Sequence, residues 1–93
     1  MDIATLLKAA TAHGASDLHL CKGAPPILRI DGRLVGLNAP PLNAEEITSM
    51  VIGILNDYQR EKIEREWELD FSLEVKDTGR FRVNAHRQRG SIE

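Results

Sequence analysis

The sequence has a single cysteine, Cys21, which excludes an internal disulfide and suits a reducing compartment. No second cysteine stands at metal-finger spacing. No basic segment followed by an apolar run opens the chain, and nowhere do about 18 apolar residues follow one another. These absences argue against an export signal and a membrane span, and they favour a cytoplasmic location.

Aromatic residues are also scarce, and the net charge is only -2. A nucleic-acid-binding face needs several exposed aromatics for base stacking, or a broad basic surface. Residues 79–83 interleave arginine with Phe81, as an RNA-binding strand does, but Phe81 shares its face with Val83 and Ala85 and is expected in the core. We therefore expect no nucleic-acid partner.

The 93 residues suffice for one domain. Asp2 is positioned to cap a helix that ends at His13-Gly14, and Asp31-Gly32 is a favoured two-residue hairpin turn. The spacing of apolar residues predicts a helix at 3–13 and strands near 16–20, 26–30 and 33–36.

Two helices are expected next. Asn43 and Glu46 have the spacing of a capping box, with Asn in place of Ser or Thr, ahead of an apolar stripe that reaches Leu55. A more polar helix at 57–67 is expected on the outside of the fold. Its spacing predicts Tyr58, Ile63 and Trp67 as core contacts; the alternative for Trp67 is contact with a neighbouring subunit.

Strict alternation of apolar and polar residues predicts two final strands, at 68–75 and after residue 79. An odd number of loop residues, 76–78 or 76–80, is needed to bring both apolar sets to one face. Glu74 then opposes Arg80 or Arg82. The order α-β-β-β-α-α-β-β predicts an α+β fold, with an antiparallel sheet and helices packed largely on one face.

Four segments carry a resemblance to a known family. They are GASDLHL at 14–20, GAPPILRIDGRL at 23–34, DFS at 70–72 and RFRVNA at 80–85. Together and in this order they resemble the PilT family of type IV pilus retraction ATPases over nearly the whole chain. The wording SDLHL and PPILRIDG favours retraction over the related type II secretion and pilus extension ATPases.

The resemblance implies a PAS-like N-terminal domain that is followed by a RecA-like domain in a homohexamer. It implies ATP and Mg²⁺ as cofactors of the whole protein, and an inner-membrane platform protein of the pilus as partner. The assembly would then lie in the cytoplasm, peripheral to the inner membrane. The runner-up interpretation is a non-enzymatic PAS-like binding or protein-interaction module.

The pattern G-x-x-x-x-G-K-[ST], whose amides and lysine hold nucleotide phosphates, does not occur in residues 1–93. We therefore expect no catalytic residue in this chain and no ATP hydrolysis by it alone, although the parent protein is expected to be an ATP hydrolase.

Four arginines lie close together near the end of the sequence: Arg80, Arg82, Arg87 and Arg89. A guanidinium holds phosphate oxygens with a planar fork of donors and stabilises charge on a transferring phosphoryl group. These residues are the candidate ATP phosphate contacts. The structural alternative is that Arg80 or Arg82 pairs with Glu74 while the others are solvated.

Ser16, Asp17 and His19 have the residue types of a catalytic group, but in a strand Asp17 and His19 are about 7 Å apart and no third group orients the histidine. A structural role is expected for Asp17, in a turn or beside a basic residue. Cys21 is expected to be a packing residue, His13 a helix C-terminal residue, and no metal site is expected.

Overall fold

The computed structural model of this chain describes residues 2–75 and 79–87. In chain order the elements are α1 (Ile3–Ala12), β1 (Asp17–Cys21), β2 (Ile27–Ile30), β3 (Arg33–Gly36), α2 (Ala44–Ile52), α3 (Asp57–Glu66), β4 (Glu68–Val75) and β5 (Gly79–His86). The predicted order is confirmed. The strands expected near 16–20 and 26–30 and the helices expected at 3–13 and 57–67 differ from these bounds by one residue.

The five strands form one sheet in the order β3-β2-β1-β5-β4. Three of the four pairings are antiparallel as expected, but β1 and β5 run parallel. The sheet is therefore mixed, which corrects the expectation of an antiparallel sheet. Alternation along a strand shows which residues share a face, but it carries no information about which distant strand lies alongside.

Both hairpins follow from local signals. Asp31 and Gly32 have φ values of 50° and 79°, the left-handed pair that a two-residue turn between β2 and β3 requires. In the second hairpin Val75 pairs with Gly79, so the shorter of the two expected loops, 76–78, is confirmed. Glu74 accordingly lies opposite Arg80.

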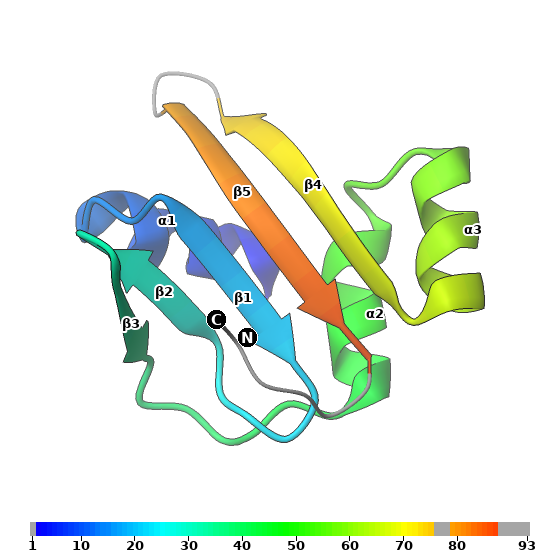
Figure 1. Cartoon of the computed structure of the whole chain (residues 1–93), viewed down its shortest axis with the longest axis horizontal. Coiled ribbons are helices and arrows are strands. Elements are labelled where there is room, and N and C mark those ends of the chain that lie inside the picture. Colours follow the sequence, from blue (N-terminus) through cyan, green and yellow to red (C-terminus); the bar gives the residue numbers. More distant parts are fainter. Residues whose placement is uncertain (1, 76–78, 88–93) are drawn as a thin grey trace.

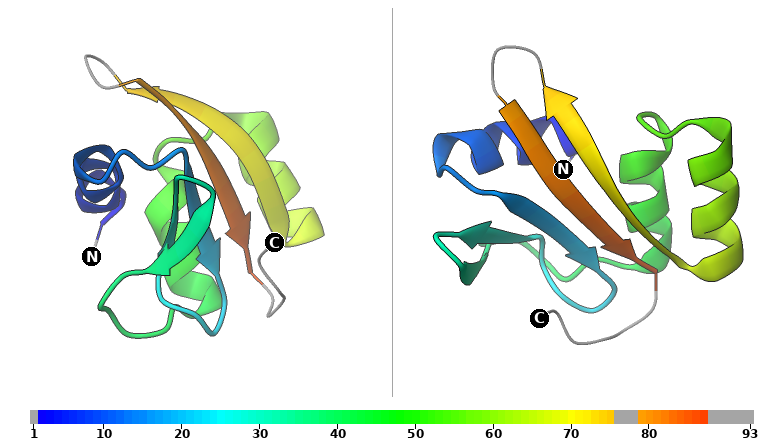
Figure 2. Two further views of the ribbon diagram at one scale, coloured as in Figure 1. Left: turned by 60° about the vertical axis from the view of Figure 1, so that its left-hand side comes forward. Right: turned by 45° about the horizontal axis from the view of Figure 1, so that its top comes forward.

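The helices cover one face of the sheet (Figures 1 and 2). α1 packs on β1, α2 packs on β1 and β5, and α3 lies beside the edge strand β4. None of the helices in the described ranges is long and apolar enough to span a membrane. The α+β class and the one-sided helical layer are thus confirmed.

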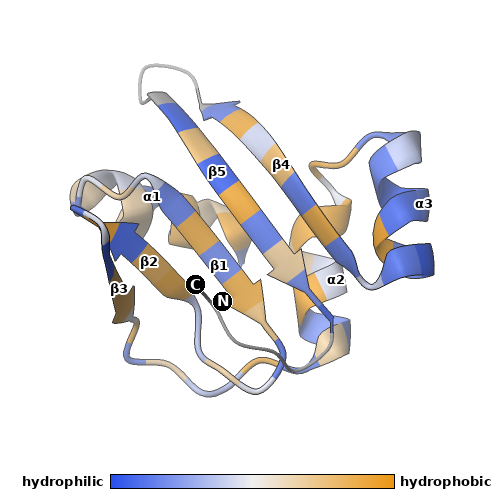
Figure 3. Ribbon diagram, in the orientation of Figure 1, coloured by the Kyte–Doolittle hydropathy of each residue, from blue (hydrophilic) through white to orange (hydrophobic). Residues whose placement is uncertain are grey.

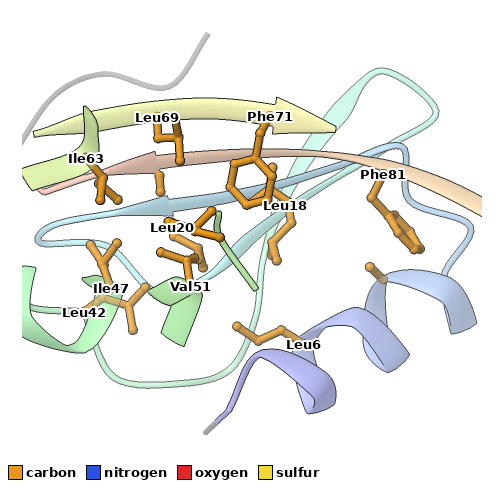
Figure 4. Packing of buried hydrophobic residues seen from close by; sticks show 14 of the residues in the cluster. Leu6, Leu18, Leu20, Leu42, Ile47, Val51, Ile63, Leu69, Phe71 and Phe81 are labelled. Atoms are coloured by element: carbon orange, nitrogen blue, oxygen red, sulfur yellow. The ribbon is translucent and has the colours of Figure 1, made fainter. Parts of the chain in front are cut away.

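The core lies between this layer and the sheet. Leu18 and Leu20 of β1 face Ile47 and Val51 of α2, while Phe81 of β5 points toward α1 (Figure 4). The first four are fully buried. Complete burial of one such aliphatic side chain stabilises the fold by about 1.5–3 kcal/mol.

Side-chain caps define where the helices begin. Asp2 accepts a hydrogen bond from the Thr5 amide at 2.9 Å, as predicted. The predicted capping box of α2 is complete, with Asn43 and Glu46 each accepting from the other's backbone N–H. A second capping box, between Asn56 and Gln59, begins α3.

The expected core contacts of α3 are only partly correct. Ile63 is fully buried, but Tyr58 is 68% exposed and Trp67 is 49% exposed. α3 packs on β4 and is joined to α2 by a hydrogen bond from Arg60 Nε to the Ile52 carbonyl, and Ile63 is its buried residue. Trp67 ends the helix with a left-handed φ of 63°, and helical spacing therefore does not describe its side chain.

Candidate functional site

Hydrophilic and hydrophobic residues alternate along β4 and β5 (Figure 3). Because the hydrophobic set is buried under the helices, the polar and charged set lies on the opposite face of the sheet. We call this the polar face. Its charged and hydrogen-bonding members include Asp17 and His19 of β1, Arg29 of β2, Asp70 of β4, and Arg80, Arg82, Asn84 and His86 of β5. The parallel pairing of β1 with β5 brings residues from the two ends of the sequence together here.

Arg82 makes the best-defined polar contact of this face. Its Nε and Nη2 donate to Oδ1 and Oδ2 of Asp70 at 3.2 and 2.8 Å, a two-point contact across adjacent strands. The side chains remain 61% and 49% exposed, respectively. The hydrogen bonds from Arg82 lower the pKa of Asp70, and the same contact raises the pKa of Arg82, so both groups are charged near neutral pH.

Asn84 holds the same carboxylate from a second side. In the amide orientation that satisfies both groups, its nitrogen lies 3.0 Å from Oδ1 and 3.3 Å from Oδ2 of Asp70. Asp70 and Asn84 are paired in the strand register, whereas Arg82 lies two residues earlier on β5, opposite Ser72. The three residues form one hydrogen-bonded group on the polar face.

The structure separates the four candidate arginines. Arg80 and Arg82 are exposed on the same face of β5. Arg87 follows β5, and its guanidinium lies 5.4 Å from the centre of the Trp67 ring, a cation–π arrangement. Its backbone N–H donates to the Trp67 carbonyl at 2.7 Å. Arg89 lies outside the described residues.

The alternative prediction, in which Arg80 or Arg82 pairs with Glu74 and the others are solvated, is only partly correct. Arg80 lies opposite Glu74, but Arg82 pairs with Asp70 rather than Glu74. Asp70 and Asn84 were not among the sequence candidates. The signal was present, because the 76–78 loop places Asp70 diagonally beside Arg82 on one face.

Ser16, Asp17 and His19 do not form a catalytic group. The Ser16 hydroxyl donates to Oδ1 of Asp17 at 2.7 Å. His19 is 6% exposed, its Nε2 has no hydrogen-bond partner among the described residues, and burial lowers its pKa. An imidazole without a partner at this nitrogen is not set to activate a nucleophile. Cys21 is buried, as expected of a packing residue, and His13 is the C-cap of α1.

The described part of the chain offers no cluster of three or more histidine, cysteine or acidic side chains suited to a metal ion. His86 Nδ1 and Glu68 Oε2 are 3.6 Å apart on the polar face. The groups on this face that are suited to bind an anion are the exposed guanidinium groups of Arg80 and Arg82. Phosphate and carboxylate are the anions whose oxygens a guanidinium binds with paired hydrogen bonds.

Comparison with known proteins identifies relatives across the chain. No protein-family model matches it. It is 47% identical over 88 residues to the type IV pilus retraction ATPase PilT of Pseudomonas aeruginosa, covering 95% of this chain and 26% of the relative. It is 33% identical over 92 residues to the type IV pilus ATPase PilU of the same organism, covering 99% of this chain and 24% of that relative.

A solved structure agrees with these relatives. The crystal structure of the pilus retraction motor PilT with bound ADP matches the fold with a TM-score of 0.73 at 40% identity, over 98% of this chain and 27% of the other. The chain thus spans about a quarter of the length of the proteins it matches. By sequence and by fold, it belongs to the PilT family, as an N-terminal domain of that family's ATPases.

Proposed function

We propose that this chain is the nucleotide-covering and ring-forming domain of a pilus retraction motor that hydrolyses ATP. The observation that carries the proposal is the exposed guanidinium of Arg82, held on the polar face by Asp70. A relative named as a retraction ATPase, at 47% identity, supports the type of motor. The name of a second relative, a twitching motility protein of Neisseria gonorrhoeae at 42% identity over 60 residues, agrees with this.

In this proposal the arginines act on the phosphates of ATP held by a following RecA-like domain. Arg82 and Arg80 bind phosphate oxygens and oppose the charge that spreads over them as the terminal phosphoryl group transfers. Bound ATP and Mg²⁺ supply the transferring group and its counter-charge. The chain has no phosphate-binding loop, and its described residues offer no metal cluster, so the other domain holds both cofactors.

The proposal extends to assembly and location. The partners are the chain's own RecA-like domain, neighbouring subunits of a homohexamer, and an inner-membrane platform protein of the pilus. Movement of this domain relative to the next transmits hydrolysis to the pilus base, on the cytoplasmic side of the inner membrane. The relatives are about four times as long as this chain, which leaves length for the nucleotide-binding domain.

The test is ATP turnover by the full-length protein with Arg82→Ala. Arginines that contact a transferring phosphoryl group are worth about 10³–10⁵ in rate, so loss of one that shares the task should lower kcat at least about tenfold. Arg65→Ala is the matched control, because Arg65 is an equally exposed arginine that pairs with Glu61 at 3.0 Å on α3.

Unchanged turnover of the Arg82 variant would contradict the proposed contact with nucleotide. A gene that continues beyond Glu93 without a phosphate-binding loop would contradict the motor assignment itself and favour an interaction module.

A further inference from the structure

A guanidinium has five N–H donors on two usable edges, and Asp70 occupies only one of them. The carboxylate of Asp70 accepts one hydrogen bond from Nε and one from Nη2 of Arg82. One N–H of Nη1 and the second N–H of Nη2 remain together on the end of the guanidinium, and the other N–H of Nη1 points back along the side chain. No hydrogen bond among the described residues uses Nη1, and the side chain is 61% exposed. The contact therefore leaves a complete two-point edge available to an anion.

The contact with Asp70 also fixes the direction of that edge. A free arginine on a strand samples many rotamers, and holding it in one of them costs conformational entropy. Two hydrogen bonds to one carboxylate define both the position and the plane of the guanidinium. Asn84 restrains the carboxylate in turn, and the register of β4 with β5 fixes the backbone of all three residues.

Solvent exposure limits what this arrangement contributes to fold stability. Ion pairs between exposed side chains contribute little to stability because water screens them. The pair of Arg65 with Glu61 is of the ordinary kind, with one hydrogen bond between residues four apart on a helix. The contact of Arg82 differs in having two donors and a third residue that holds the acceptor.

We propose that Asp70, supported by Asn84, is a positioning residue that presents the free edge of Arg82 to phosphate oxygens of the nucleotide. This inference rests on the proposed function, in which Arg82 meets those oxygens. Asp70 itself does not touch the nucleotide, because its carboxylate would be repelled by phosphate. Its effect on turnover passes entirely through Arg82.

The positioning can be measured directly in the 93-residue chain. NMR of the arginine Nε–H groups should show a slowly exchanging Arg82 signal that Asp70→Asn removes. Glu61→Gln, which removes the carboxylate of the comparable helical pair, should leave the Arg82 signal unchanged. A fast-exchanging Arg82 Nε–H in the unsubstituted chain would overturn the proposal.

ATP turnover by the full-length protein tests the consequence. Misplacing a reacting group slightly is costly, so Asp70→Asn should lower kcat about tenfold, with the nucleotide KM less affected. Asp70→Glu keeps the charge and should restore part of the rate. Asp70→Asn added to Arg82→Ala should cause no further loss, since both changes act through one guanidinium.

The outcomes separate the two proposals. If Arg82→Ala has no effect, the proposed nucleotide contact fails and the positioning role fails with it. If Arg82→Ala lowers turnover but Asp70→Asn does not, or if their effects multiply, only the positioning role fails. A faster Asp70→Asn enzyme would show that the carboxylate competes with phosphate, which also overturns it.

Discussion

His19 is a buried base on a face that is otherwise polar. It is 6% exposed, and burial disfavours its charged form and lowers its pKa. Asp17 opposes this shift, whereas Arg29, His86 and Arg82 reinforce it. The effect of burial on the pKa exceeds that of the Asp17 carboxylate, and His19 is neutral in the folded chain at neutral pH.

This burial predicts a dependence of stability on pH. Because the folded-state pKa lies below the unfolded value of about 6.5, the unfolded chain takes up the proton first as the pH falls. The contribution of His19 is complete above that value and is lost as the pH falls through the folded-state pKa. The free energy of unfolding, measured by urea denaturation, should therefore decline as the pH falls below about 6.5.

His19→Leu should reduce this decline, since the replacement is apolar, similar in size and does not titrate. Its cost at neutral pH should be small, because the orphaned Nε2 gains nothing from its surroundings. Asn38→Ala, in the exposed segment before α2, is the control; it changes no titratable group and should leave the slope as it is. Equal slopes in the unsubstituted chain and His19→Leu would show that another group is responsible.

At the level of residues, sequence reasoning identified the arginines but not their arrangement. The types and spacing of Arg80 and Arg82 were enough to predict two cations on one face. The contact with Asp70 depends on the hairpin register, and the sequence allowed two registers. Arg87 was grouped with them by nearness in the chain, but a strand end separates it and Trp67 holds it.

Among the elements, α2 depends most clearly on the residue that caps its start, Asn43. Asn43 and Glu46 satisfy backbone donors that would otherwise face water at the start of the helix. Ile47 and Val51, which follow within two turns, are fully buried against the sheet. A loss of order at the start of α2 therefore also loosens core contacts.

Asn43→Ala should lower the free energy of unfolding by about 1 kcal/mol, the usual cost of losing such a cap. Asn38→Ala, in the exposed connector before α2, serves as the control and should change it by less than about 0.5 kcal/mol. Thermal or urea unfolding of the 93-residue chain measures both. Equal stability of the two variants would mean that the capping box contributes nothing in solution.

Local signals explain why most elements could be predicted. The caps at Asp2 and Asn43, the turn at Asp31-Gly32 and the alternation after Glu68 each lie within a few residues of what they determine. The parallel pairing of β1 with β5 joins residues more than 60 positions apart, as Leu18 with Val83. The spacing of apolar residues carries no information about that pairing, so the mixed sheet could not be predicted from the sequence.

At the scale of the whole molecule, the exposed apolar side chains are divided between two ends. Leu34 and Val35 lie on the edge strand β3, and Tyr58 and Trp67 lie on or next to α3. β3 and α3 are at opposite ends of the sheet in Figure 1. The described residues therefore present two small apolar areas rather than one broad one.

This division predicts that the 93-residue chain is a monomer or at most a weak dimer. Stable interfaces bury about 1,200–2,000 Å² in total with an apolar centre, and two separated pairs of side chains do not provide such a centre. Sedimentation equilibrium at about 10 µM, where an interface of micromolar affinity would be populated, should give a mass near 10.4 kDa. Arg33→Glu and Tyr58→Ser should leave that mass unchanged. A dimer at this concentration that Tyr58→Ser abolishes would instead locate a self-association surface on α3, and the proposed ring would then not depend on the following domain alone.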